Sequence, residues 1–167
     1  MLPIIHDPNP ILRTRSEELD LDVIISPGMQ KLMDDMIETM YDDDGIGLAA
    51  PQIGENIRLL VIGKEALKNF KIKKGILQTK KDFVLINPTW HKTARKTAWD
   101  TEGCLSIPKT YGKVKRFFYI HVEGLDRHGE PVAFDASKYF ARVIQHETDH
   151  LNGVLFIDKA RDVYTVD

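Results

Sequence analysis

Cysteine is almost absent from this chain of 167 residues, because Cys104 is its one thiol. An internal disulfide framework is therefore excluded, and the composition fits a reducing compartment, which predicts a cytoplasmic protein. Long apolar runs are missing as well: every run falls well short of the roughly 18 residues of a membrane-spanning helix, so we expect no membrane partner. The first residues show no basic segment followed by an apolar stretch, which argues against a secretory signal.

An excess of positive charge is also missing. The chain has 23 Lys and Arg against 25 Asp and Glu, a net charge of -2 and a pI near 6.3. This balance gives no indication of a specific nucleic-acid partner. Residues 64–82 are a local exception with seven lysines; a solvated surface insertion is favoured there over a basic patch for RNA.

The length fits one domain, and no repeat, low-complexity tract or linker interrupts it. We therefore expect a single domain over residues 1–167, and we expect this domain to act as a monomer.

The segment Gln145–Gly153 contains the pattern His-Glu-x-x-His. On a helix, His146 and His150 lie one turn apart on one face, so both imidazoles can bind one metal ion. Glu147 lies beside that face, where its carboxylate can reach a water without binding the metal itself. Two surface histidines on an ordinary amphipathic helix are the alternative. Apolar residues at helical spacing indicate that one side of this helix is buried: Phe140, Val143, Ile144 and Leu151.

Cys104 has three interpretations: an inert core thiol, a nucleophile or a metal ligand. A catalytic divalent site typically has three protein ligands and one open position. Peptidases with a His-Glu-x-x-His helix take the third ligand from a downstream Glu or His, but after His150 the only side-chain carboxylates here belong to aspartates. We therefore expect the third ligand upstream, and a thiolate is a strong candidate.

A second amphipathic helix is predicted from Ser26 and Pro27, a cap followed by a proline at the first helical position. Its stripe of Met, Leu and Ile from Met29 to Met40 favours core packing over an adaptable binding surface. Residues 42–45 end it. Buried strands are predicted at 58–62 and 83–86, another strand at 92–99, and a hairpin at 117–123 and 131–134 with a turn at 126–129. Residues 3–25 are predicted to form an irregular arm.

These elements predict an α+β fold. Mostly antiparallel β-strands would pack around the C-terminal metal-binding helix, and the amphipathic helix would lie near the N-terminus.

Residues 45–52, Gly-Ile-Gly-Leu-Ala-Ala-Pro-Gln, are dense in small side chains. A phosphate-binding loop is disfavoured because the glycine spacing fits neither nucleotide-binding pattern. A tightly packed structural turn is one interpretation. An extended ligand that pairs edge to edge with this segment is the other, and Gln52 would then present its amide to the site.

Three segments, in this order, resemble the motifs of the peptide deformylases: residues 45–52, Glu-Gly-Cys-Leu-Ser at 102–106 and Gln-His-Glu-Thr-Asp-His-Leu at 145–151. Further similarity extends the resemblance over roughly residues 5–158. It implies a metal-dependent hydrolase that removes the N-terminal formyl group from formylmethionine of nascent polypeptides. Formate would be released by attack of a metal-bound hydroxide.

The resemblance also implies roles for the residues that carry the reaction. The metal ligands would be Cys104, His146 and His150, holding one divalent ion, natively Fe²⁺, with Zn²⁺, Ni²⁺ or Co²⁺ as substitutes. Glu147 would be the general acid and base, while the Gln52 side chain and the Leu105 backbone N–H would stabilise the oxyanion.

Further roles concern substrate binding and support. The substrate would add a strand along Gly45, Ile46 and Gly47, and the methionine pocket would involve Tyr139, Val143 and His146. Glu102 would pair with Arg116 and brace the second motif.

Three features depart from the family. The lysine-rich segment at 64–82 is longer than expected in the plainest members. Lys138, followed by bulky Tyr139 and Phe140, stands where the family commonly has Gly, which affects the shape of the pocket. The chain also stops nine residues after Asp158, without the C-terminal helix that longer members use to dock on the ribosome. Transient ribosome contact is therefore kept as a hypothesis that does not use that route.

Two other functions compete with this one. A peptidase with the same helix would need a third ligand after His150. A catalytically silent domain that binds peptide ends would have lost a ligand or the glutamate, yet all five positions are intact: Gln52, Cys104, His146, Glu147 and His150.

Overall fold

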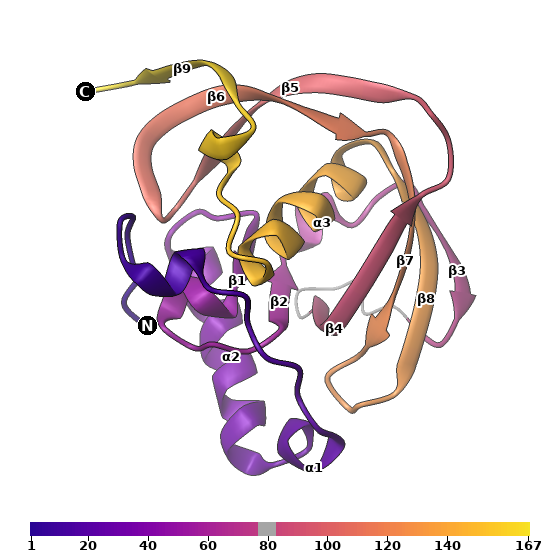
Figure 1. The fold of residues 1–167 in the computed structure, drawn as a ribbon. Helices are drawn as coiled ribbons and strands as arrows, with labels where there is room; N and C mark the ends of the chain where they lie inside the picture. Colours follow the sequence, from indigo (N-terminus) through magenta and orange to yellow (C-terminus); the bar gives the residue numbers. More distant parts are fainter. Residues whose placement is uncertain (77–82) are drawn as a thin grey trace.

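The computed structural model describes residues 1–76 and 83–167. Two antiparallel sheets lie on either side of one central helix, α3 (Lys138–Leu151), as Figure 1 shows. The larger sheet has the order β1-β2-β4-β7-β8-β3, with bounds Gly47–Ala49, Leu59–Ile62, Phe83–Lys92, Tyr119–Leu125, Pro131–Ser137 and Phe70–Lys74. The smaller sheet has the order β5-β6-β9, with bounds Thr97–Cys104, Ile107–Phe117 and Arg161–Thr165. The predicted α+β class is confirmed.

The larger sheet is covered on both faces, which explains the continuous apolar runs in β2 and β4. Leu60 and Ile62 of β2 belong to a buried cluster with Phe140 and Ile144 of α3. The alternate residues of the same strand pack instead with the methionines of α2 (Pro27–Asp42). Because side chains alternate along a strand, one short apolar segment serves two cores.

Helix α2 begins and ends where its sequence predicts. The hydroxyl of Ser26 accepts a hydrogen bond from the Met29 backbone N–H at 3.3 Å, and Pro27 is the first helical residue. The helix ends at Asp42, and Asp44 follows with φ 55°. Met33, Met36 and Met40 are fully buried, so core packing is the correct interpretation of the methionine stripe.

Part of the strand prediction is wrong. Residues 93–96 form a bend, so the strand expected at 92–99 is the end of β4 and the start of β5. Strands β6 and β9 were not expected at all. The face of β6 that turns inward carries Gly112, Val114 and Arg116, so this strand lacks the apolar alternation that marks a half-buried strand.

The lysine-rich segment is partly structural. Strand β3 pairs with β8, and Phe70 packs edge to face on Phe140 with ring centroids 5.8 Å apart. The segment is therefore anchored in the larger sheet and is more than a solvated insertion, although Lys71, Lys73 and Lys74 are exposed. Residues 77–82, with two of the seven lysines, lie outside the described residues.

The N-terminal arm contains two short helical turns, η1 (Pro10–Arg13) and α1 (Leu21–Ile24), and is otherwise irregular as expected. Three further 3₁₀ turns are η2 (Ala50–Ile53), η3 (Lys64–Ala66) and η4 (Phe156–Asp158). Among the described helices, none has the length and apolar character needed to cross a membrane.

Candidate active site

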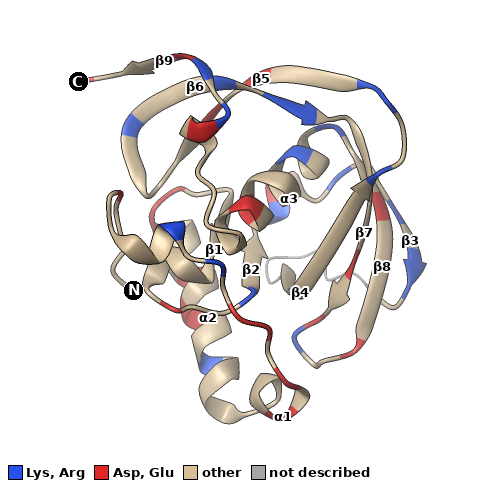
Figure 2. Cartoon of the chain, viewed as in Figure 1, with Lys and Arg blue, Asp and Glu red and all other residues tan. Residues whose placement is uncertain are grey.

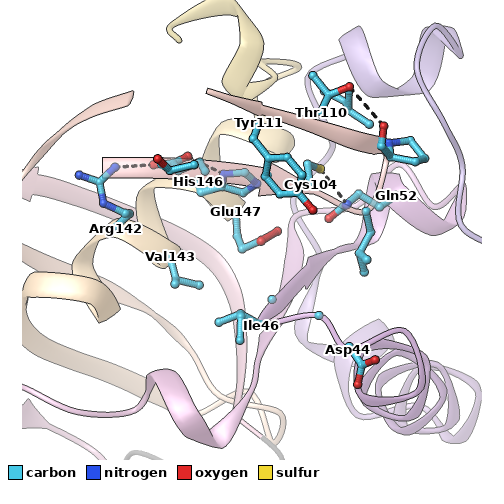
Figure 3. Close-up of a pocket in the computed structure, with 18 of the residues that line it drawn as sticks. Asp44, Ile46, Gln52, Cys104, Thr110, Tyr111, Arg142, Val143, His146 and Glu147 are labelled. Atoms are coloured by element: carbon cyan, nitrogen blue, oxygen red, sulfur yellow. Dashed lines mark hydrogen bonds and ion pairs between the residues drawn. The ribbon is translucent and has the colours of Figure 1, made fainter. Parts of the chain in front are cut away.

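A cavity of about 490 Å³ opens between α3, the end of β5 and the segment that leads into β1. Figure 3 shows His146 and Glu147 of α3 facing Cys104 and Gln52 across it. Helix α3 is buried over most of its length, so its polar residues lie between the two sheets. The titratable side chains of α3 are therefore largely shielded from water.

Three potential metal ligands converge beside this cavity, and two of them, Cys104 and His146, line it. The ligand atoms of Cys104, His146 and His150 all lie within 4.8 Å of one another, and Cys104 Sγ is 3.3 Å from His150 Nε2. The register of β5 and β6 shifts between Gly103 and Cys104. Such an irregularity re-aims a side chain, and here it accompanies the approach of the thiol to the histidines of α3.

A buried carboxylate orients the first histidine. Glu102 Oε1 lies 2.8 Å from His146 Nδ1, and the Arg116 guanidinium donates two hydrogen bonds of 2.9 Å to the same carboxylate. Arg142 donates a further hydrogen bond of 2.6 Å. Burial alone would raise the pKa of Glu102, but hydrogen bonds with Arg116 and His146 outweigh it and hold the pKa well below its usual range. Glu102 is therefore ionised, and its contact with Nδ1 leaves Nε2 of His146 as the atom for a metal.

His146 holds a proton strongly in the metal-free site. Burial lowers the pKa of its imidazole, but its interactions with Cys104 and Glu102 outweigh burial and raise the pKa to about 10. His150, by contrast, has its pKa lowered well below the usual value, first by burial and then by the charge of His146. A metal that binds here must displace the proton of His146, so binding releases protons to solution.

Glu147 lies on the same helix but outside this network. Its Oε1 atom is buried and has no hydrogen-bond partner in the described part of the chain. Burial raises the pKa of its carboxyl to about 7. A Cβ atom built on Gly47 would lie 2.8 Å from Glu147 Oε2, so the backbone of the first motif packs directly against this carboxylate. A carboxyl with such a pKa can exchange a proton near neutral pH.

Gln52 presents a hydrogen-bond donor to the cavity. Its Oε1 accepts a hydrogen bond from the Ala49 N–H at 2.9 Å. This contact fixes the amide so that Nε2 points to the Ser106 hydroxyl at 3.2 Å and to Cys104 Sγ at 3.5 Å. Leu105 follows Cys104 directly and also lines the cavity.

The remaining sequence-predicted residues form the walls of the cavity. Gly45, Ile46 and Gly47 line one side, and Tyr139 and Val143 line another. Tyr139 is 49% exposed at the rim, whereas Val143 is only 6% exposed. His150 contacts Cys104 Sγ and is not among the residues that line the cavity. Every other sequence-predicted site residue lines the cavity or belongs to the carboxylate network beside it.

Sequence reasoning missed several residues of the site, and three of them shape it most. Arg142 lies one helical turn before His146, a spacing that could have indicated its contact with Glu102. Asp149 accepts a hydrogen bond of 2.7 Å from Arg116. Tyr111 lines the cavity, where its ring covers Gly103: a Cβ atom on Gly103 would lie 2.7 Å from Tyr111 Cε1. No local pattern marks the last two, because both contacts join elements far apart in the sequence.

The residues fit a divalent transition metal. One thiolate and two imidazoles are ligands that such ions prefer, and three ligands leave a position open for water or substrate. The unpartnered oxygen of Glu147 points to a further polar group in the cavity, because buried carboxylates are normally hydrogen-bonded. A sheet-flanked helix with this donor set and a buried glutamate defines a metal-dependent hydrolase.

Comparisons with known proteins specify the family. The family model described as polypeptide deformylase matches residues 1–165. Peptide deformylase 1 of Clostridium acetobutylicum is 45% identical over 149 residues, which cover 89% of this chain and 87% of that protein. Peptide deformylase of Helicobacter pylori is 42% identical over 159 residues, covering 95% and 86%.

Solved structures agree with the sequence comparisons. The crystal structure of peptide deformylase from Thermotoga maritima has a TM-score of 0.80 at 35% identity and covers 96% of this chain and 98% of that chain. One from Synechococcus elongatus, in complex with actinonin, has a TM-score of 0.80 at 36% identity, covering 96% and 79%. The chain belongs to the polypeptide deformylase family.

Proposed function

We propose that this chain hydrolyses the N-formyl group of nascent polypeptides at the described cavity, with one divalent metal held by Cys104, His146 and His150. Deformylation is the activity of the family, and this chain is an enzyme of that family. The observation that carries the proposal is the convergence of the three ligand atoms within 4.8 Å beside Glu147, whose buried Oε1 has no hydrogen-bond partner among the described residues. The peptidase alternative loses its support, since it requires a third ligand downstream of His150.

The metal, when bound, supplies Lewis acidity that makes water nucleophilic near neutral pH. Glu147 accepts the proton of the attacking water and passes it to the departing amine. In the metal-free protein, burial raises the pKa of the Glu147 carboxyl to about 7, and a raised pKa favours exchange of a proton near neutral pH.

Charge that develops on the formyl oxygen is stabilised by the Gln52 amide and the Leu105 backbone N–H. Gln52 Nε2 is held in place by the contact of Oε1 with the Ala49 N–H, so no reorganisation is required during the reaction. A donor fixed in this way contributes about 3 kcal/mol to transition-state stabilisation.

The formylated peptide adds as an extended strand along Gly45, Ile46 and Gly47. Its methionine side chain enters the cavity between Val143 and Tyr139, which line it together with His146. Backbone pairing gives affinity without regard to sequence, whereas the pocket selects the first side chain.

The test is formate release from a formyl-Met-Ala-Ser peptide by protein purified anaerobically, with its metal content measured in parallel. Glu147→Gln keeps the shape of the side chain and should lose formate release by a factor of about 10² or more while retaining metal. Cys104→Ala should lose the metal as well as activity. Near-normal turnover in Glu147→Gln, or full metal content in Cys104→Ala, would remove that residue from its role.

A further variant tests the oxyanion donor. Gln52→Glu keeps an acceptor for the Ala49 N–H but replaces the Nε2 donor with a carboxylate oxygen. The expected loss in kcat is roughly 10²- to 10³-fold with the metal retained. An unchanged kcat would exclude the Gln52 amide from transition-state stabilisation.

For the native ion we propose Fe²⁺, with Zn²⁺, Ni²⁺ and Co²⁺ as substitutes, since the ligand set accepts all four. Anaerobic purification should give iron and the highest activity, and activity should fall in air unless nickel replaces the iron. Zinc alone after anaerobic purification, with full activity, would contradict this assignment.

The cellular setting is part of the same proposal. Residues 1–167 form one catalytic domain that acts as a cytoplasmic monomer and contacts the ribosome transiently. Its mass of 19.1 kDa should be recovered by light scattering at working concentrations. A stable dimer would contradict the proposed monomer.

A further inference from the structure

The outer face of the β5-β6-β9 sheet is basic and aromatic, although the chain as a whole is slightly acidic. Cross-strand pairs place Trp99 opposite Lys115 and Lys113 opposite Arg161. Directly opposed residues share a face of a sheet, and all four residues are exposed. Figure 2 shows the basic residues along β6 and at the start of β9. We call this surface, made of Trp99, Lys113, Lys115 and Arg161, the outer basic face.

The cations of the outer basic face lack a neutralising carboxylate among residues 1–76 and 83–167. In the described part of the chain, no ion pair joins Lys113, Lys115 or Arg161 to a carboxylate. Asp100 is paired with the buried Val114 and therefore lies on the opposite face. Like charges directly opposed across two strands destabilise a sheet, so the pair formed by Lys113 and Arg161 is unfavourable without an external anion.

Trp99 organises these cations. Its ring is 43% exposed and lies 4.7 Å from the Arg161 guanidinium carbon and 5.9 Å from Lys115 Nζ. The Arg161 guanidinium lies over the indole, and its N–H donors stay available because none of the described carboxylates forms an ion pair with it. Planar donors beside an exposed aromatic ring match the phosphates and bases of a single-stranded nucleic acid.

The outer basic face is continuous with the mouth of the active-site cavity. Tyr111, next but one to Lys113 on β6, lines the cavity and packs against Tyr164 of β9 with ring centroids 5.8 Å apart. A polyanion on this face would therefore lie beside the opening that admits the nascent chain.

We propose that the outer basic face docks RNA without reading its sequence: Lys113, Lys115 and Arg161 contact phosphates, and Trp99 stacks on a base. The choice of RNA rests on the proposed function, because a nascent chain is presented on a particle whose surface is rich in RNA. Binding of RNA is nevertheless measured separately from formate release, so either can fail alone.

The experiment measures binding of a fluorescein-labelled oligouridylate, about a dozen nucleotides long, to the metal-loaded enzyme by anisotropy. Three phosphate contacts predict a plot of log affinity against log salt with a slope of about -2. Lys113→Glu/Lys115→Glu should weaken binding at least about tenfold at low salt and reduce the slope to about -0.7. Neither lysine lines the cavity, so formate release from the short peptide should be unchanged.

The matched control reverses two lysines elsewhere. Lys71→Glu/Lys74→Glu changes the net charge equally, on strand β3, where Lys71 is paired with Asp135 and Lys73 lies 3.7 Å from the same carboxylate. The control should weaken RNA binding less than about twofold. Equal losses in the two double variants, or no binding by the unaltered enzyme at low salt, would overturn the proposal.

Stacking is tested with Trp99→Ala and Trp99→Phe. The alanine variant should lose about tenfold in RNA affinity and the phenylalanine variant much less, since any aromatic ring can stack on a base. A poly-glutamate peptide that binds as tightly as the RNA, with no effect of Trp99→Ala, would identify an acidic protein as the partner and overturn the assignment to RNA.

Discussion

The two walls of the active-site cavity are built in opposite ways. On the side of α3 and β5, buried charged side chains hold one another: Glu102 contacts Arg116, Arg142 and His146. On the side of residues 45–47, the wall is mostly bare backbone. The charged wall fixes the ligands through many strong contacts, whereas the bare wall works by leaving room. The position of a catalytic group can therefore be fixed either by charged side chains that hold it or by the absence of a side chain that would displace it.

The largest effect should come from breaking the charged wall. Glu102→Ala leaves Arg142 buried without its carboxylate and Arg116 with Asp149 alone, and we expect a loss of about 3–5 kcal/mol in the free energy of unfolding. Metal affinity should also fall by roughly 10- to 100-fold, because His146 loses the group that orients it.

Urea unfolding and metal titration measure both quantities. Glu102→Gln serves as the control, since it keeps an acceptor for hydrogen bonds and should cost less than Glu102→Ala. A loss below about 1 kcal/mol in Glu102→Ala would mean that the charged wall does not depend on this carboxylate.

The pH dependence of the free energy of unfolding tests the environment of Glu147, which lies where the two walls meet. In the metal-free protein its pKa is raised by burial from 4.5 to about 7. Below pH 4.5 the carboxyl is protonated in both folded and unfolded chains. As the pH rises to 7, the unfolded chain releases the proton that the folded chain keeps, so the folded state loses up to about 3 kcal/mol.

Glu147→Gln cannot titrate and should escape this loss. Urea unfolding of both metal-free proteins between about pH 4 and pH 8 should show the variant gaining relative stability as the pH rises. A constant difference across this range would contradict the raised pKa.

One added methyl group should disrupt the wall formed by residues 45–47. In Gly47→Ala the new Cβ would meet Glu147 Oε2 at 2.8 Å, so the carboxylate must move. Activity should fall by about 10² because small misplacements of a catalytic group are costly, with metal content unchanged. Gly28→Ala is the matched control: apart from its chain neighbours and the backbone of its own helix, nothing lies within 4 Å of its Cβ position, and formate release should be unaffected.

The smallest effect concerns the start of the helix that carries the charged wall. Lys138 has φ 58°, a conformation that costs a residue with a Cβ atom more than it costs glycine. Lys138→Gly should therefore stabilise the protein by about 1 kcal/mol. Lys138→Ala removes the same charge but keeps the Cβ atom, so it should give no gain in thermal unfolding.

The Lys138 variants also test a departure from the family that the sequence shows. Lys138 occupies a position where the resemblance implies glycine, and the positive φ supplies a backbone reason for that preference. The bulky residues that follow are accommodated, because Phe140 is buried in the core between Phe83 and Phe134. Only Tyr139 remains at the rim.

How far the sequence predicts the molecule depends on the kind of contact. Helix α2 and the strands β2 and β4 were predictable because their apolar residues follow the period of the element. The residues proposed for the metal and for the reaction could be named from the sequence because three short motifs carry them. Strand β6 was not, since its inner face holds Arg116, which is stable there only through Glu102 and Asp149. A contact between residues far apart in the chain leaves no local period to recognise.

Because Arg116 bridges strand β5 and helix α3, we expect these two elements to unfold together. Its guanidinium joins Glu102 of β5 to Asp149 near the end of α3, and Asp149 in turn lies 3.0 Å from Lys159 Nζ. Local opening of the small sheet would expose these charges one after another, so partial unfolding there should be rare. Backbone amides of β5, β6 and α3 should therefore exchange with deuterium as one cooperative unit, slower than those of the exposed strand β9.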